Sequence, residues 1–171
     1  MFLQVDNFLP PELFSMFVTD SQRFSQGLTS GGRSNPTSVK SAEDIKNKLG
    51  IKWFAHFKQL QSLFDVEIIP ESCRRQATNG ASADWHWDAA LPLGDPNADI
   101  TKSYTSLLYT SPDWVVQEDE SGAWQSRDGL TIQPMPNRLI IYSRDIEHRV
   151  KSGTWSGIRS LALLSFYEHM G

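Results

Sequence analysis

One of the four histidines in this chain lies two residues before an aspartate, in the segment Asp84-Trp-His-Trp-Asp88. Side chains at positions i and i+2 of a β-strand point to the same side, so His86 and Asp88 can contact one metal ion. Taken alone, this spacing is also explained by a structural histidine between two tryptophans, with its ring bonded to a nearby carboxylate. His56 lies in a helical pattern, and we interpret it as a helix-face residue rather than a ligand.

Two further residues raise the case for a metal site. His148 follows the apolar run Leu139-Ile140-Ile141-Tyr142, and Arg159 begins a second apolar run eleven residues later. Two imidazoles and one carboxylate form the facial triad of non-haem Fe(II) oxygenases, which leaves three coordination positions for a chelating 2-oxo acid and O2. A buried arginine would pair bidentately with the far carboxylate of that acid. Because burying an unpaired arginine is costly, its anion is either a ligand or an internal carboxylate.

These residues resemble the motif of the 2-oxoglutarate/Fe(II)-dependent dioxygenases, and most closely that of the prolyl 4-hydroxylase-like group. The resemblance extends over residues 66–168, where it includes the segments Ser103–Trp114 and Ile132–Tyr142, and it is also present in the opening segment Val5–Leu13. It implies three iron ligands, an anchor for the 5-carboxylate of 2-oxoglutarate, and a hydrogen-bond donor to that carboxylate. The implied iron ligands are His86, Asp88 and His148. Arg159 would anchor the 5-carboxylate, and Tyr109 would donate the hydrogen bond to it. The alternative for Tyr109 is a cross-strand aromatic in the core.

The resemblance implies an enzyme that uses Fe(II), 2-oxoglutarate and O2 to hydroxylate a prolyl residue in a protein or peptide. Three departures leave the substrate open. Arg75 and Gln76 stand where protein prolyl hydroxylases often carry a tyrosine, Glu120–Trp124 replaces the usual Gly-Gly-Glu turn, and the gap from His148 to Arg159 is slightly long. Arg75 and Gln76 favour a polar small molecule, so hydroxylation of a free amino acid or other small molecule is the alternative.

A different class of function is a catalytically silent, cupin-like module in which the same three ligands hold Zn²⁺ or no metal. Arg159 distinguishes the two, because a structural zinc site needs no anion anchor eleven residues after its last ligand. A metal-dependent hydrolase is a third possibility, but the sequence lacks an additional general base in a pattern such as His-Glu-x-x-His.

The composition fits one globular domain spanning residues 1–171, with 39% hydrophobic residues and a net charge of −4. The absence of a basic block argues against a nucleic-acid partner. A single cysteine excludes an internal disulfide framework. No apolar run approaches ~18 residues, which argues against a membrane span, and the first residues do not have the pattern of a signal peptide. We therefore expect a cytoplasmic protein, whose oligomeric state stays open.

Residues 1–65 are expected to form helical support and a flexible loop. Pro10-Pro11-Glu12 opens a helical pattern with an apolar stripe. A second helix is expected from Ser41, where Ser-Ala-Glu-Asp has the form of a capping box, with a break or bend at Gly50. Residues 25–40 are rich in Gly, Ser, Thr and Asn and are typical of a mobile loop.

Residues 66–168 have the pattern of short strands separated by turns, and Trp85 and Trp87 are expected in their core. Together with the preceding helices, they indicate a mainly β fold: a β-sandwich or jelly roll backed by two or three helices. The family resemblance specifies a double-stranded β-helix that contains the active site. The loops at 25–40 and 91–102 are candidates for lids that close over substrate. The expected strands are 66–69, 73–78, 82–88, 103–110, 122–125, 130–134, 138–143, 147–151 and 158–168.

Overall fold

The computed structural model describes residues 1–26, 31–80, 82–155 and 157–169. Within these residues, the helices are α1 (Pro11–Gln26), α2 (Ala42–Leu49), α3 (Ile51–Gln61) and the short 3-10 helix η1 (Ile100–Lys102). The strands are β1 (Phe2–Val5), β2 (Gly31–Arg33), β3 (Thr37–Ser38), β4 (Ile68–Thr78), β5 (Ala83–His86), β6 (Ser103–Tyr109), β7 (Trp124–Ser126), β8 (Thr131–Ile132), β9 (Leu139–Ser143), β10 (His148–Val150) and β11 (Arg159–Glu168).

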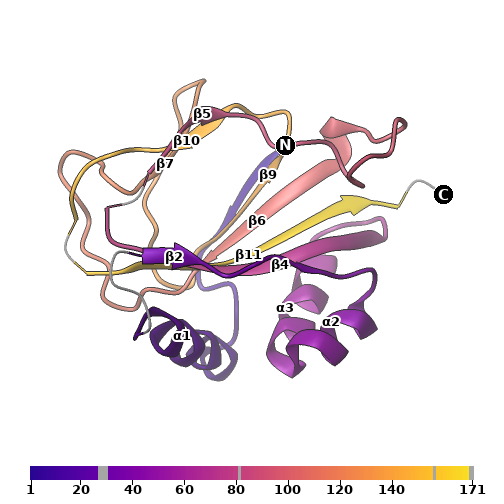
Figure 1. The fold of residues 1–171 in the computed structure, drawn as a ribbon, viewed down its shortest axis with the longest axis horizontal. Helices are drawn as coiled ribbons and strands as arrows, with labels where there is room; N and C mark the ends of the chain where they lie inside the picture. Colours follow the sequence, from indigo (N-terminus) through magenta and orange to yellow (C-terminus); the bar gives the residue numbers. More distant parts are fainter. Residues whose placement is uncertain (27–30, 81, 156, 170–171) are drawn as a thin grey trace.

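The strands form two antiparallel sheets. The larger sheet has the order β1-β9-β6-β11-β4-β2, with β3 also paired to β4, and the smaller sheet has the order β5-β10-β7-β8. The three α-helices cover one face of the larger sheet, and the smaller sheet lies on its other side (Figure 1). The expected fold class, a double-stranded β-helix core backed by helices, is confirmed. Among the described residues, no helix combines the length and apolar character needed to cross a bilayer.

The helical layer is held by apolar side chains that pack on the larger sheet. Phe17 of α1 and Trp53 of α3 are 1% and 3% exposed and meet edge to face, with ring centroids 5.4 Å apart. They belong to one buried cluster with Leu164 and Phe166 of β11. Burial of this surface away from water is the main stabilising contribution to the fold.

The second expected helix is divided where the sequence indicates. The Ser41 hydroxyl accepts a hydrogen bond from the backbone N–H of Asp44 at 3.0 Å and so caps α2. Gly50 separates α2 from α3 with φ +91°, a conformation that glycine adopts without steric cost. The break at Gly50 therefore lets two short helices replace one long one.

Alternation along β11 decides which side chains enter the space between the sheets. Ala162 and Leu164 belong to the cluster under the helices, whereas Leu161 and Leu163 belong to the cluster between the two sheets. Arg159 precedes Leu161 by two residues, so it shares that inner face, and only 1% of it is exposed. A cationic side chain is thus buried between two sheets in an otherwise apolar cluster.

The expectation of a loop throughout residues 25–40 is wrong for part of that segment. Gly31 pairs with Thr78 and Thr37 pairs with Cys73, so β2 and β3 both add to the edge of β4. Without them, this edge would expose a row of unpaired backbone groups. Residues 27–30 lie outside the described residues, and a lid at 25–40 stays a prediction.

Two expected strands, 66–69 and 73–78, are a single strand in the structure. β4 continues through Pro70, which pairs with Phe166, whereas Ser165 pairs with Ser72, so Glu71 is the extra residue of a bulge in β4. A proline has no N–H for the ladder, and a bulge lets the strand pass it without losing its pairing on either side.

Candidate metal centre

The structure brings His86, Asp88 and His148 together. His86 at the end of β5 and His148 at the start of β10 are cross-strand partners, and their ring centroids lie 4.3 Å apart. Asp88 follows β5, with Oδ1 3.6 Å from Nε2 of His86 and Oδ2 3.8 Å from Nε2 of His148. One potential ligand atom from each of the three lies within 4.8 Å of the other two. Two imidazoles and a carboxylate in this arrangement can bind one divalent metal ion.

Local hydrogen bonds orient both imidazole rings for this role. Nδ1 of His86 lies 2.7 Å from the Asp84 carbonyl oxygen, and Nδ1 of His148 lies 2.9 Å from the Ile146 carbonyl oxygen. A carbonyl oxygen only accepts hydrogen bonds, so Nδ1 carries the proton in each ring. Each ring therefore turns Nε2 toward Asp88, as metal-binding histidines turn it toward their ion.

The site is buried on one side and open on the other. The His148 side chain is 4% exposed, whereas that of His86 is 41% exposed. Burial lowers the pKa of His148, which favours its neutral, metal-binding form. Trp87, expected in the core, is 60% exposed, because it follows the last residue of β5 at the open side of the site.

Aromatic side chains fix the buried ring. The indole of Trp124 stacks on His148 with ring centroids 5.7 Å apart and an interplanar angle of 19°, and the ring of Tyr142 lies 4.6 Å away. The Tyr142 hydroxyl lies 3.3 Å from Nε2 of His148. Burial raises the pKa of Tyr142, so its hydroxyl stays protonated beside the buried ring.

Asp88 is held by a second layer of polar contacts. The Thr105 hydroxyl donates to Oδ2 of Asp88 at 3.1 Å and accepts from Nη1 of Arg144 at 3.3 Å. Arg144 also donates from Nε to the Ala89 carbonyl oxygen at 2.6 Å. These contacts position the carboxylate beside the two imidazoles.

Arg159 is buried without an anionic partner in the described part of the chain. Its Nε donates to the Gly122 carbonyl oxygen at 2.7 Å, but its Nη2 is buried and makes no hydrogen bond. Arginine keeps its charge under these conditions, and an unpaired buried charge costs several kcal/mol. An anion from outside the chain would remove that cost.

Two buried polar atoms beside Arg159 and one on the ring stacked against His148 lack partners among the described residues. They are the hydroxyl of Tyr109, Oγ1 of Thr78 and Nε1 of Trp124. Thr78 is the cross-strand neighbour of Arg159, and the Arg159 guanidinium carbon lies 5.4 Å from the ring centroid of Tyr109. The hydroxyls of Tyr109 and Thr78 can donate hydrogen bonds, so together with Arg159 they fit a buried carboxylate.

The two parts of the site share one wall. Trp124 and Tyr142, which contact His148, belong to the same buried cluster as Tyr109. Sequence reasoning did not single out Thr78, Trp124 or Tyr142. Their places in strands facing the inner cluster are the only signal that could have found them, and that signal needs the strand register.

Of the two polar residues expected near the site, Arg75 lies elsewhere. Its guanidinium points to the helical side, where Nη1 lies 3.2 Å from Oδ1 of Asp20 and the guanidinium carbon lies 4.8 Å from the centroid of the Phe24 ring. Gln76 faces inward opposite Leu161. The alternation of β4 explains the difference, and it makes Arg74, not Arg75, the arginine on the inner face.

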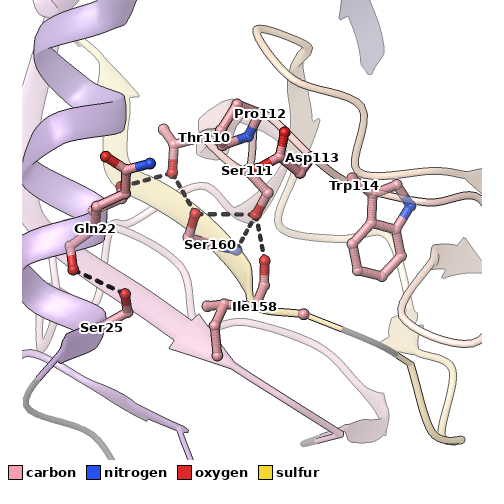
Figure 2. Close-up of a pocket in the computed structure, with 11 residues that line it drawn as sticks. Gln22, Ser25, Thr110, Ser111, Pro112, Asp113, Trp114, Ile158 and Ser160 are labelled. Atoms are coloured by element: carbon pink, nitrogen blue, oxygen red, sulfur yellow. Dashed lines mark hydrogen bonds between the residues drawn. The ribbon is translucent and has the colours of Figure 1, made fainter.

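A separate cavity of about 230 Å³ lies on the helical side of β11, between α1 and the end of β6. Figure 2 shows its hydroxyl groups, which are bonded to one another from Ser21 through Thr110 and Ser160 to Ser111, at 2.7, 2.9 and 3.0 Å. Ser160 faces away from Arg159, so this cavity is not part of the candidate metal centre.

Comparisons with known proteins place the fold. No protein-family model and no curated protein matches this sequence. A prolyl-4-hydroxylase from Pseudomonas putida has a similar structure, with a TM-score of 0.63 and 21% identity over 99% of this chain and 93% of that chain. A prolyl hydroxylase from Trichoplax adhaerens, in complex with a hypoxia-inducible-factor peptide, gives a TM-score of 0.66 and 16% identity over 98% and 83% of the two chains.

The chain has the fold of the 2-oxoglutarate/Fe(II) oxygenases. HygX from Streptomyces hygroscopicus, with nickel and 2-oxoglutarate bound, extends the likeness with a TM-score of 0.64 and 11% identity over 99% of this chain and 83% of that chain. At identities of 11–21%, the likeness concerns the fold. The reaction that the protein catalyses must therefore be inferred from the residues of the candidate metal centre and from Arg159.

Proposed function

We propose that this protein is an Fe(II)- and 2-oxoglutarate-dependent oxygenase that hydroxylates a C–H bond. The observation that carries the proposal is the pairing of a His86-Asp88-His148 cluster with a buried Arg159 that has no carboxylate partner among the described residues. A structural zinc site accounts for the cluster but not for the arginine. Support also comes from similar structures that hold 2-oxoglutarate with nickel, or iron.

Each group has a role in this proposal. His86, Asp88 and His148 hold the metal, and Arg159, with Tyr109 and Thr78, binds the far carboxylate of 2-oxoglutarate between the sheets. When bound, the metal and 2-oxoglutarate supply the oxidising chemistry, with O2 as oxidant and succinate and carbon dioxide as co-products. The aromatic wall formed by Trp124 and Tyr142 excludes water from this chemistry.

A prolyl residue in a peptide or protein is the first substrate to test. Two of the similar structures are prolyl hydroxylases, and one of them holds a peptide. HygX has been solved with hygromycin B bound, so the fold also serves a small molecule, and a free amino acid is the second substrate class. A cytoplasmic location stays a prediction.

An anaerobic titration tests the proposal without a substrate. Fe(II) and 2-oxoglutarate are added to the metal-free protein, and the weak visible charge-transfer band of the chelate is recorded. We expect the band in the parent and its loss or weakening in Arg159→Ala. Arg149→Ala is the matched control, because Arg149 lies against Trp85 and Gln125 instead of entering the inner cluster. Iron binding without a band would overturn the oxygenase and favour the silent metal-binding module.

A further inference from the structure

Arg74 is a cationic side chain on the inner face of the larger sheet. It pairs across β4 and β11 with Leu163, which packs against the cluster between the sheets. Cross-strand partners in an antiparallel sheet point to the same side, so Arg74 also faces that space. It is half-buried, and burial, with the nearby positive charge of Arg33, lowers its pKa.

Two more arginines lie around the same opening. Arg33 of β2 is the cross-strand partner of Gln76, so it shares the inner face with Arg74 two residues along the neighbouring strand. Arg144 reaches the metal centre from the end of β9 through the Thr105 hydroxyl. That hydroxyl also donates to Asp88 at 3.1 Å, so Arg144 is one hydrogen-bonded group away from the candidate metal ligand.

None of the ion pairs among the described residues includes Arg33, Arg74 or Arg144. By contrast, three other arginines lie within 3.2 Å of a carboxylate oxygen. These are Arg75 with Asp20, Arg127 with Glu147 and Arg138 with Asp6.

The groups of the proposed reaction do not neutralise the three arginines either. In the proposed complex, the negative charge of Asp88 is neutralised by the metal ion, and the far carboxylate of 2-oxoglutarate forms an ion pair with Arg159. Among the described residues, Glu71 is the one further carboxylate whose charge acts on Arg144, so three arginines against one carboxylate leave an excess of positive charge at this side of the site. Such a field attracts anions and repels cations.

We propose that Arg74, assisted by Arg33 and Arg144, binds a carboxylate of the substrate, so that the enzyme selects an acidic substrate. This inference rests on the proposed oxygenase function and names the chemistry of its substrate. The carboxylate belongs either to an acidic side chain near the target residue of a peptide or to a free acid. Arginine suits this role because its planar guanidinium binds carboxylates bidentately.

The experiment compares probes that differ only in charge. Peptides of sequence Ac-Gly-X-Gly-Pro-Gly-X-Gly-NH2, in which X is Glu, Gln or Lys, represent the peptide source, and L-proline with prolinamide represents the free acid. Binding is measured by tryptophan fluorescence on protein loaded with Mn(II) and 2-oxoglutarate under anaerobic conditions. Trp87, 60% exposed between two of the candidate ligands, is the natural reporter.

Arg74→Met and Arg75→Met form a matched pair, because the two neighbouring arginines face opposite sides of β4. We expect the parent to prefer the Glu peptide or L-proline over the neutral counterpart. Arg74→Met is expected to weaken that probe's binding on the order of 10- to 100-fold, with Arg75→Met unchanged. Arg74→Glu is expected to reverse the preference toward the Lys peptide. Melting temperatures of all variants identify any that fail to fold.

Equal binding of charged and neutral probes by the parent, or equal effects of Arg74→Met and Arg75→Met, would overturn the inference. Which acidic probe is preferred distinguishes the peptide from the free acid. The chelate band with Fe(II) and 2-oxoglutarate is recorded on the same samples. A parent that shows the band without charge preference refutes only the substrate class, whereas a parent that binds iron without the band refutes the proposed function.

Discussion

Replacing Arg159 with methionine is expected to make the ligand-free protein more stable while abolishing its response to 2-oxoglutarate. Arg159 is 1% exposed and has no carboxylate partner among the described residues, so the folded state carries the desolvation cost of a buried ion. That cost is several kcal/mol. Methionine has a similar length, carries no charge and adapts to irregular apolar space.

The substitution also removes the hydrogen bond from Nε to the Gly122 carbonyl oxygen at 2.7 Å. A buried carbonyl left without its partner costs ~1–3 kcal/mol, which offsets part of the gain. The expected net stabilisation is ~1–3 kcal/mol. For a chain of this length, that corresponds to a melting temperature higher by about 2–12 °C.

The assay is thermal unfolding of the metal-free protein, followed by the same measurement with Mn(II) and 2-oxoglutarate. Ligand at 100 times its dissociation constant stabilises the parent by ~2.7 kcal/mol, and Arg159→Met is expected to show no such response. Arg138→Met is the control of opposite sign, because Arg138 is paired with Asp6 at 2.7 Å and its loss destabilises. If ligand-free Arg159→Met melted below the parent, Arg159 would be a structural cation and the assignment would be wrong.

Three further changes test other parts of the structure. Burial lowers the pKa of His56 to about 3, so as the pH falls below 6.5 the unfolded chain binds a proton that the folded chain does not. The free energy of unfolding then falls by ~1.4 kcal/mol per pH unit down to about pH 3. Urea unfolding at pH 7 and pH 5 should show that His56→Phe removes about 2 kcal/mol of this pH dependence. Tyr109→Phe should weaken 2-oxoglutarate binding about 10-fold in the anaerobic titration, with the protein fold intact by circular dichroism; unchanged affinity would leave Tyr109 a core aromatic. Gly153→Ala should lower the melting temperature by several degrees, since a Cβ there would lie 1.9 Å from Oγ of Ser121 and φ is +151°; an unchanged melting curve would contradict this close approach.

The sequence predicted those elements whose boundaries are encoded locally. The Ser41 cap and the Gly50 break are visible in a few consecutive residues, and both are where the pattern places them. β2 could not be predicted, because Gly31 and Gly32 have no intrinsic preference for a strand and adopt it only against the edge of β4. Residues 66–69 and 73–78 were expected to be two strands, but a bulge at Glu71 lets β4 run through both, and its pairing depends on β11, far away in the sequence.

In the candidate site too, the residues that the sequence predicted are those with a local pattern, and those that it missed depend on the strand register. The ligand spacing in His86-x-Asp88 and the resemblance around it were sufficient to select the residues that the structure brings together. The choice between Arg74 and Arg75 was beyond the sequence, because it depends on which face of β4 looks inward. Trp87 was expected in the core because strict alternation was extended past the end of β5 at His86.

The cross-strand pairing of His86 with His148 has a consequence for the life of the protein in a cell. β5 and β10 are only four and three residues long, so few backbone hydrogen bonds hold them together. An ion shared by the two histidines and Asp88 would join these strands as a cross-link, and its binding energy would become part of the folding energy. With the metal scarce, the smaller sheet would open more often and proteases would reach it sooner. Metal supply would then control how much of the protein persists, as well as how active it is.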